Sequence, residues 1–576
     1  MIELTAVSAV KVAHVLCRRY LVAAAIFSAF VNLLYIAPTL YMLQVYDRVV
    51  PTQGYQTLFF LTIVLLFALA TLSLLDRVRT RLVVRAGVRL DAALAPLILD
   101  ATLGRPDLPI ARQSLREFDT MRATLTGSGI LALFDAPWIP IYIIVCFLVH
   151  PWVGLVAIAG CTILPLIAWA TEHATRNRLD RAQAIAGASY AGQDVLLASA
   201  DTVRALGMRR AMVARQLRQR AAMLVAQTEA SFAAGGYLTA TKFTRLALQS
   251  LALGLGALLA IDNKISAGAI FAASFLIARA LAPIEQLIGT WRPLVQARQS
   301  YANLNSLLTG ASASADVMQL PPPRGAVAVE NVTFLNDARN GAIVNGVSFT
   351  ISPGEAVAIV GPSGAGKSTL IRVLAGALLA DRGTIRFDGA DSRDWDPERL
   401  ARHIGYLPQD SVLFAGSVAE NIARFSAELD GDRASIDAAV VAAAQKVGAD
   451  ALIRRLPGGY NHELKLGGRG ISAGQAQRIA LARAVFGDPD ILILDEPNAH
   501  LDSEGDAALI AALSALKANG RTILIVSHKL SILPVVDRLL VLRDGRVEMF
   551  GPRDEVLPKI APNSVRRMHQ PVMATA

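Results

Sequence analysis

The sequence predicts an α-helical membrane domain with six spanning helices, followed by a soluble α/β domain. Hydropathy is the first reason: 53% of the 576 residues are hydrophobic and the mean hydropathy is +0.44, which is high for a soluble protein. The second reason is a change of composition at the triple proline 321–323, which is typical of a linker. We expect a membrane domain over 1–308, a linker over 309–326, a soluble domain over 327–560 and a tail over 561–576.

Six apolar runs are long enough to cross a bilayer, whose hydrocarbon core takes about 20 helical residues. The third and fourth runs lie in one stretch that His150 and Pro151 interrupt, which indicates a tight turn between two spans. Short connections join span one to two, three to four and five to six, so all three lie on the same side of the membrane. The expected spans are 20–46, 57–75, the two halves of 130–171, 231–261 and 267–288.

The distribution of charge orients these spans. The net charge is +10 and the pI is 9.7, values that would also suit a nucleic-acid partner. The arginines, however, gather in the two long connections, between spans two and three and between spans four and five. Basic loops stay in the cytoplasm, so both termini and the soluble domain are expected there, with the lipid bilayer around the spans. This topology explains the charge without nucleic acid.

Four ionisable residues fall inside the last two spans: Lys242, Arg245, Arg279 and Glu285. Ionisable groups in spans usually face a cavity or a partner rather than lipid. They either line a translocation path or form salt bridges between helices and snorkel to the interface, and the sequence leaves both interpretations open. The three cysteines, Cys17, Cys146 and Cys161, lie in apolar sequence and are expected to be small core residues.

The soluble domain alternates β-like runs with helical patterns, which predicts a largely parallel α/β sheet. The β-like runs are 356–360, 384–387, 491–494 and 522–526.

A phosphate-binding motif follows the first of these runs. Residues 361–368, Gly-Pro-Ser-Gly-Ala-Gly-Lys-Ser, match the pattern G-x-x-x-x-G-K-[ST] between a strand and a helix. Glycines let backbone N–H groups approach phosphate oxygens, and the helix start favours their charge. We expect Lys367 to reach the β- and γ-phosphates of ATP and Ser368 to ligate Mg²⁺. The residues expected to hold ATP here are Gly361, Ser363, Gly364, Ala365, Gly366, Lys367, Ser368 and Thr369.

The apolar run 491–494 ends in two carboxylates, Asp495 and Glu496. At the end of a buried strand, Asp495 is expected to hold Mg²⁺ and Glu496 to orient or deprotonate the attacking water. The alternative, a pair of acidic residues capping the surface, is disfavoured by the apolar strand before them.

At this point the chain resembles the ATPases of the ABC transporter family. Residues 471–475, Ile-Ser-Ala-Gly-Gln, are similar to the signature motif of that family, and 478–484 continue it. Gln409, His528 and Asp502 stand at further motif positions. The resemblance implies that Gln409 contacts Mg²⁺ and the attacking water, that His528 binds the γ-phosphate, and that Asp502 aligns two ATPase domains. Glu496, His528 and Gln409 are thus the expected catalytic residues.

The resemblance also implies a homodimer. Ser472, Gly474 and Gln475 begin a helix, whose N–H groups and hydroxyl suit a γ-phosphate held by the opposite subunit. Two positions depart from the family pattern. Ala473 replaces the usual glycine, and Asn336 stands where many exporters have an aromatic residue that stacks on adenine.

The membrane half resembles a narrower group, the permease/ATPase subunits of bacterial type I protein secretion systems. The strings 40–49, 134–140 and 278–286 carry this likeness. It implies the bacterial inner membrane, a periplasmic membrane-fusion adaptor, an outer-membrane tunnel protein and a secreted protein substrate with an uncleaved C-terminal signal. The short segment before the first span resembles the simpler exporters that lack an N-terminal peptidase-like domain.

Three other functions share some of these features. An exporter of lipids, drugs or small peptides would carry the same ATPase motifs. A non-transport ABC ATPase acting on nucleic acid is disfavoured by the six apolar runs, and a sensor that only binds ATP by the complete set of catalytic residues. The sequence does not name the cargo or say whether it passes unfolded.

Overall fold

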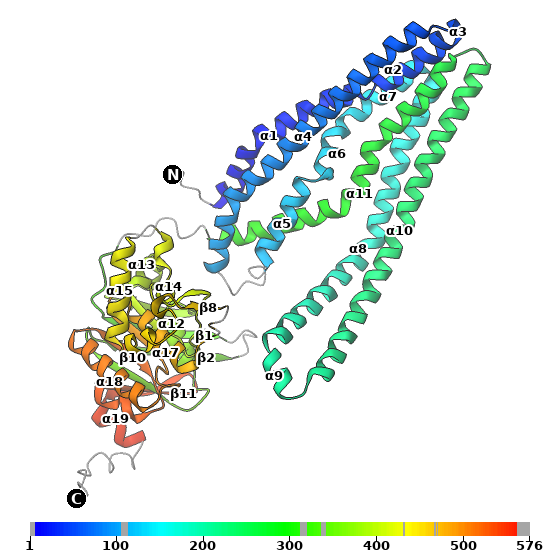
Figure 1. Ribbon diagram of the computed structural model, residues 1–576. Coiled ribbons are helices and arrows are strands. Elements are labelled where there is room, and N and C mark those ends of the chain that lie inside the picture. The colour runs from blue at the N-terminus through cyan, green and yellow to red at the C-terminus, as the bar shows by residue number, and fades with distance from the viewer. Residues whose placement is uncertain are drawn as a thin grey trace, which may run out of the picture. The chain divides into compact units, whose positions relative to one another are not determined.

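The computed structural model describes residues 6–104, 113–311, 320–335, 341–429, 432–465, 468 and 470–560. The chain divides into two units, Met1–Ala315 and Asp316–Ala576. The first unit is helical and the second combines helices with β-sheets (Figure 1). The expected tail over 561–576 and part of the expected linker lie outside the described residues.

Within the described residues of the first unit, six helical segments are long and apolar enough to cross a membrane, so the predicted fold is confirmed. These segments are Cys17–Thr52, Tyr55–Gly104, Ser114–Val149, Pro151–Leu197, Arg209–Ile261 and Ala267–Trp291. The helices are α1 (Ala6–Leu34), α2 (Ala37–Gln44), the π-helical turn η1 (Val45–Val49), α3 (Val50–Thr52), α4 (Tyr55–Gly104), α5 (Ser114–Leu125), α6 (Ser128–Asp135), η3 (Ala136–Trp138), α7 (Ile139–Val149), α8 (Pro151–Ala198), α9 (Ala200–Ala205), α10 (Arg209–Ile261) and α11 (Ala267–Ala311).

Three helices continue far beyond the apolar runs. α4, α8 and α10 have 50, 48 and 53 residues, or about 70 to 80 Å at 1.5 Å per residue, more than twice a bilayer core. α8 and α10 lie side by side and α9 joins their far ends (Figure 1). The long Arg-rich connections are therefore mostly helix.

The predicted hairpin between spans three and four is present. His150 has extended backbone torsions, and its Nδ1 accepts a hydrogen bond from the backbone N–H of Trp152 at 3.3 Å. Pro151 opens α8, where the N–H that proline lacks would have no helical partner. His150 thus both ends α7 and caps the start of α8.

An apolar cluster joins α7, α8, α10 and α11. Close packing is visible at Gly160, where an added Cβ would lie 2.8 Å from Cδ2 of Leu281. Cys17 and Cys146 are buried and Cys161 is half-buried, and all three are free thiols.

The second unit contains a four-stranded sheet of order β2-β1-β4-β5 and a six-stranded sheet of order β12-β11-β3-β10-β9-β6, besides a short two-stranded ladder in the described residues. In the six-stranded sheet, β11, β3, β10, β9 and β6 are parallel, as expected. The run 384–387, however, lies in β4 of the other sheet, whose pairings are antiparallel. The strands are β1 (Val327–Leu335), β2 (Ala342–Ile351), β3 (Ala356–Val360), β4 (Arg382–Phe387), β5 (Ala390–Asp391), β6 (Ile404–Leu407), β7 (Gly416–Ser417), β8 (Glu463–Leu464), β9 (Ile491–Asp495), β10 (Thr522–Val526), β11 (Arg538–Arg543) and β12 (Arg546–Pro552).

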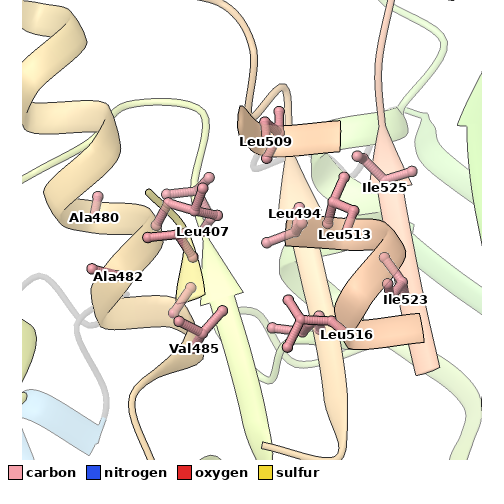
Figure 2. Packing of buried hydrophobic residues seen from close by; sticks show 14 of the residues in the cluster. Leu407, Ala480, Ala482, Val485, Leu494, Leu509, Leu513, Leu516, Ile523 and Ile525 are labelled. Carbon is pink, nitrogen blue, oxygen red and sulfur yellow. The ribbon is translucent and has the colours of Figure 1, made fainter. Parts of the chain in front are cut away.

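The helices of this unit cover the six-stranded sheet with apolar side chains. Leu509, Leu513 and Leu516 of α18 face β9 and β10, and Ala480 of α17 lies opposite β6 (Figure 2). Burying each such leucine contributes about 1.5 to 3 kcal/mol. The helices are α12 (Lys367–Leu374), α13 (Pro397–His403), α14 (Val418–Ile422), α15 (Arg433–Lys446), α16 (Asp450–Arg454), α17 (Ala473–Val485), α18 (Ser503–Ala518) and α19 (Arg553–Ile560).

Candidate active site

The phosphate-binding motif forms the loop between β3 and α12, and its glycines have distinct structural reasons. Gly361 and Gly366 have positive φ angles, and a Cβ there would lie 2.1 Å from O of Leu542 and 2.6 Å from O of Ile343. Gly364 also has a positive φ angle, but nothing lies within 4 Å of its missing Cβ. The outer glycines allow close packing, and the middle one leaves the backbone open to an approaching phosphate.

Lys367 folds back over this loop. Its Nζ donates hydrogen bonds to the carbonyl oxygens of Gly361 at 3.0 Å and Pro362 at 2.8 Å. Burial holds the pKa of the ammonium group below its usual value, although the charges of Glu496 and Asp495 act in the opposite direction. When a nucleotide binds, its phosphate oxygens would replace these two carbonyl oxygens as the hydrogen-bond acceptors of the ammonium group.

We expect Lys367→Ala to weaken ATP binding by about 10- to 100-fold, because hydrogen bonds to a charged group contribute about 1.5 to 3 kcal/mol. Titration of a fluorescent ATP analogue measures this change. Lys559→Ala, at an exposed lysine of α19, is the matched control and should bind normally. Equal affinity of the two variants for the ATP analogue would show that Lys367 does not contact the phosphates.

Asp495 and Ser368 come together although they are far apart in the chain. β9 and β3 flank β10, so the end of β9 lies near the start of α12. Ser368 Oγ donates to Oδ1 of Asp495 at 3.3 Å, and Asp495 is almost fully buried. Burial raises the pKa of this carboxyl, while the hydroxyl of Ser368 acts in the opposite direction.

These two oxygens fit Mg²⁺. No group of three or more His, Cys, Asp or Glu residues gathers anywhere in the described ranges. Mg²⁺ prefers oxygen ligands and is usually held by one or two protein groups together with substrate phosphates and water. Gln409, the third expected ligand, is exposed after β6, and the described residues show no hydrogen bond from it to Asp495 or Glu496.

Glu496 has a left-handed backbone, with φ of 49°. For a residue with a side chain this conformation costs about 1 to 3 kcal/mol. Its N–H donates to O of Val526 at 2.9 Å, and its Oε1 lies 3.3 Å from Nε2 of His528. The strained turn directs the carboxylate away from the line of β9 and toward His528, so two of the expected catalytic residues are neighbours.

A buried amide supports this turn, and sequence reasoning did not find it. Gln477 of α17 is 1% exposed, and its Nε2 donates to O of Glu496 at 3.3 Å. Ser411 Oγ donates to Oε1 of Gln477 at 2.7 Å. The amide thus links the signature helix to the chain that follows Gln409. The sequence does offer a signal, because Gln477 falls among the small and apolar residues of 473–485. A buried amide at such a position needs hydrogen-bond partners.

The expected signature residues lie at the start of α17. The N–H of Gln475 donates to Ser472 Oγ at 3.3 Å, and its own Oε1 accepts from the N–H of Ser472 at 2.8 Å, which is a capping box. Ala473 is exposed, so its methyl group does not fill the site within one chain. A Cβ on Gly474 would lie 2.9 Å from O of His500, which explains the glycine there.

Asp502 caps the next helix. It accepts from the N–H of Gly505 at 2.8 Å and from Arg478 of α17 at 2.9 Å. The N–H of Gly505, followed by the charge of Arg478, holds the pKa of Asp502 below its usual range. Its alignment of two ATPase domains stays a prediction. Asn336 lies outside the described residues, and Phe334 is half-buried against the core of the four-stranded sheet.

The ionisable residues of the spans lie in three different environments. Arg245 of α10 and Glu285 of α11 form a salt bridge of 2.9 Å, one of the two arrangements left open by the sequence. Arg279 lies over the ring of Tyr35, 3.5 Å from its centroid. Lys242 is exposed in the single chain.

A buried polar network joins α1, α4, α6 and α7, and the sequence did not reveal it. Asp135 accepts from Arg79 at 2.8 Å and from Asn32 at 2.6 Å. Arg79 also pairs with Asp76 at 2.6 Å, and Tyr142 Oη donates to O of Asn32 at 2.8 Å. The network lines a cavity of about 250 Å³. String 134–140 thus contains a charge that holds four helices together.

Comparisons with known proteins cover both units. Residues 21–282 match the family model of the ABC transporter transmembrane region, and residues 344–499 match that of the ABC transporter. The type I secretion system ATP-binding protein PrsD of Rhizobium meliloti (strain 1021) is 40% identical over 96% of this chain and 95% of its own length. The alpha-hemolysin translocation ATP-binding protein HlyB of Escherichia coli O157:H7 is 28% identical over 94% of this chain and 77% of its own length.

A solved structure shares the fold. The bacterial Atm1-family ABC exporter with ATP bound superposes with a TM-score of 0.82, at 24% sequence identity, over 96% of this chain and 99% of that chain.

Proposed function

Since this chain belongs to the ABC transporter family, with the transmembrane region and the ATPase domain on one polypeptide, we propose that it is the ATP-hydrolysing permease of a type I protein secretion system. The observation that carries this proposal is the likeness to PrsD, which runs through both units rather than through the ATPase domain alone. The resemblance stated from the sequence motifs is confirmed for the family, and so is ATP hydrolysis coupled to transport.

The site performs hydrolysis with residues that lie at or just after the carboxyl ends of β3, β9 and β10. Backbone N–H groups of the glycine-rich loop and Lys367 bind and orient the β- and γ-phosphates. Ser368 and Asp495 would hold Mg²⁺, which neutralises charge that develops on the phosphates. Glu496 accepts the proton of the attacking water, and His528 holds the γ-phosphate beside it. Gln409 approaches the same phosphate when the site closes.

The single chain supplies only part of this site. The N-terminus of α17, with Ser472 and Ala473 exposed, is a ready site for an anion. We propose that it closes on the γ-phosphate bound by a second copy of the chain, so that the working form is a homodimer. The hydroxyl of Ser472 then exchanges its capping contact for a phosphate oxygen.

The surroundings follow from topology and from the relatives. We propose that both termini and the ATPase domain lie in the cytoplasm and that the spans cross the bacterial inner membrane; the basic helical extensions support the orientation and the secretion-system relatives support the membrane. A periplasmic membrane-fusion adaptor and an outer-membrane tunnel protein complete the path of a secreted protein. No nucleic-acid partner is required.

Deletion of the gene tests the proposed function. We expect a defined set of proteins to disappear from the culture medium, and to return with the intact gene but not with the Glu496→Gln form. An unchanged set of secreted proteins, together with altered membrane lipids or drug sensitivity, would favour an exporter of small molecules instead.

Chelation should abolish ATP hydrolysis, and added Mg²⁺ should restore it. Ser368→Ala removes one of the two protein oxygens, so the Mg²⁺ concentration for half-maximal ATPase activity should rise by about 10-fold, the equivalent of one hydrogen bond of about 1.4 kcal/mol. Ser514→Ala, at an exposed serine of α18, is the control. An unchanged Mg²⁺ requirement in the Ser368 variant would contradict this ligand assignment.

A further inference from the structure

One face of α1 carries an open groove of about 560 Å³, lined by Arg18, Arg19, Val22, Ala23 and Ile26. Its charged end and its apolar end are both accessible. Arg18 and Arg19 are exposed, and Val22 and Ile26 are 48% and 54% exposed. The groove therefore offers two guanidinium groups at one end and apolar surface at the other.

The apolar part continues along the same helix face. Positions 18, 22, 26, 30 and 33 follow the three- and four-residue spacing that places side chains above one another on a helix. Phe30 and Leu33 are 54% and 59% exposed. From Arg18 to Leu33 the face is about 22 Å long, more than one leaflet of a bilayer core of about 30 Å.

Within the part of the chain that the structure describes, the arginines at the charged end have no protein counter-ion. Among the described residues, neither Arg18 nor Arg19 forms a hydrogen bond or an ion pair. Arg89 of α4 lies 5.1 Å from the centroid of the Tyr20 ring and adds a third cation at this level. Arg79 and Arg245 of the same unit, in contrast, each pair with a carboxylate.

α1 and α4 pack against each other next to the charged end of the groove. Cys17 Sγ donates to O of Ala86 at 3.4 Å, which places Cys17 of α1 beside the middle of α4. Arg18 and Arg19 directly precede the expected first span, 20–46, so by the positive-inside rule they lie at the cytoplasmic boundary of the bilayer. A phosphate group at this boundary can meet the guanidinium groups of Arg18 and Arg19 while an acyl chain runs along Val22, Ile26 and Phe30.

We propose that this groove on α1 binds an anionic phospholipid of the cytoplasmic leaflet. Guanidinium groups bind phosphate oxygens in a fork geometry, and the exposed stripe behind them accepts the acyl chain. Basic pockets beside spans at this side of the membrane are suited to anionic head groups. The inference depends on the membrane placement of α1 and is independent of the cargo.

Retention of phosphatidylglycerol by the purified, full-length protein tests the inference. The protein is stripped of lipid, offered vesicles of phosphatidylcholine with and without phosphatidylglycerol, and extracted again, and the lipid that stays bound is counted by native mass spectrometry. We expect the wild type to retain phosphatidylglycerol selectively. Arg18→Gln/Arg19→Gln should lower this affinity by roughly 30-fold.

Two further variants separate the head group from the groove. Ile26→Trp keeps both charges but fills the apolar part, so it should also lose the bound lipid. Arg209→Gln/Arg210→Gln makes the same change of charge at an exposed arginine pair that begins α10, and should retain lipid as the wild type does. Val22→Trp replaces Ile26→Trp if that variant does not fold.

Several results would overturn the proposal. Equal losses in the two double-arginine variants would show diffuse surface charge, and full retention by Ile26→Trp would show that no groove is used. Displacement of the lipid by millimolar inorganic phosphate would show that the two arginines bind phosphate alone and that the acyl chain contributes no affinity. A lower dimer fraction in Ile26→Trp, with unchanged lipid, would make this face a subunit interface.

Discussion

Glu496→Gln is expected to abolish ATP turnover while ATP binding stays intact. The substitution keeps the size of the side chain and its contact with His528, which lies 3.3 Å from the carboxylate, but it removes the group that accepts a proton. General-base catalysis typically contributes about 10²- to 10⁴-fold, so kcat should fall by at least about 100-fold. Phosphate release in reconstituted membranes measures kcat, and nucleotide titration measures binding.

The control for this variant lies on the neighbouring helix. Glu504 is an exposed carboxylate in the first turn of α18, and Glu504→Gln should leave kcat unchanged. Turnover near the wild-type rate in Glu496→Gln would reject Glu496 as the base. A loss of ATP binding in the same variant would instead show that Glu496 supports the structure of the nucleotide-binding site.

Asp135→Ala is expected to destabilise the membrane unit by about 3 to 5 kcal/mol. The carboxylate accepts from Arg79 and Asn32 among side chains that are nearly excluded from solvent. Without it, the buried guanidinium of Arg79 keeps the neutral hydroxyl of Ser28 and, as its one remaining charged partner among the described residues, Asp76, whose side chain is 44% exposed. Removing one partner of a buried pair is costly because the other charge remains. Thermal unfolding of the detergent-purified protein measures the loss.

Two comparisons test the reason for this loss. Asp135→Leu/Arg79→Met removes both buried charges and should recover much of the stability, because the remaining charge, on Asp76, is 44% exposed and stays solvated. Asp119→Ala breaks an exposed pair with Arg122 and should change the stability by less than about 1 kcal/mol. If Asp135→Ala were as mild as Asp119→Ala, the network would not hold the helices together.

Features that are encoded locally could be predicted from the sequence. Apolar length alone defines the spans, and the pair His150 and Pro151 defines the turn between α7 and α8. The loop 361–368 is specified by glycines whose positive φ angles and close contacts exclude other residues. These patterns were sufficient to predict the fold class and the family.

Features that depend on packing between distant segments could not be predicted. Arg79 was counted among the basic residues of a cytoplasmic loop, yet it is buried against Asp135, because only the antiparallel packing of α1 and α4 brings it there. Gln477 supports Glu496 across two secondary-structure elements. The first expected span, 20–46, is one apolar run in the sequence, but in the structure it breaks between α1 and α2, just before Pro38, and becomes a π-helical turn at η1.

The rate of ATP hydrolysis per chain in nanodiscs that hold one copy or two copies of the protein tests the central claim most directly. Each nucleotide is expected to need the glycine-rich loop of one chain and the start of α17 of another. Discs with two copies should therefore hydrolyse ATP, whereas discs with one copy should bind ATP and remain inactive. Equal rates per chain in both kinds of disc would contradict a shared site.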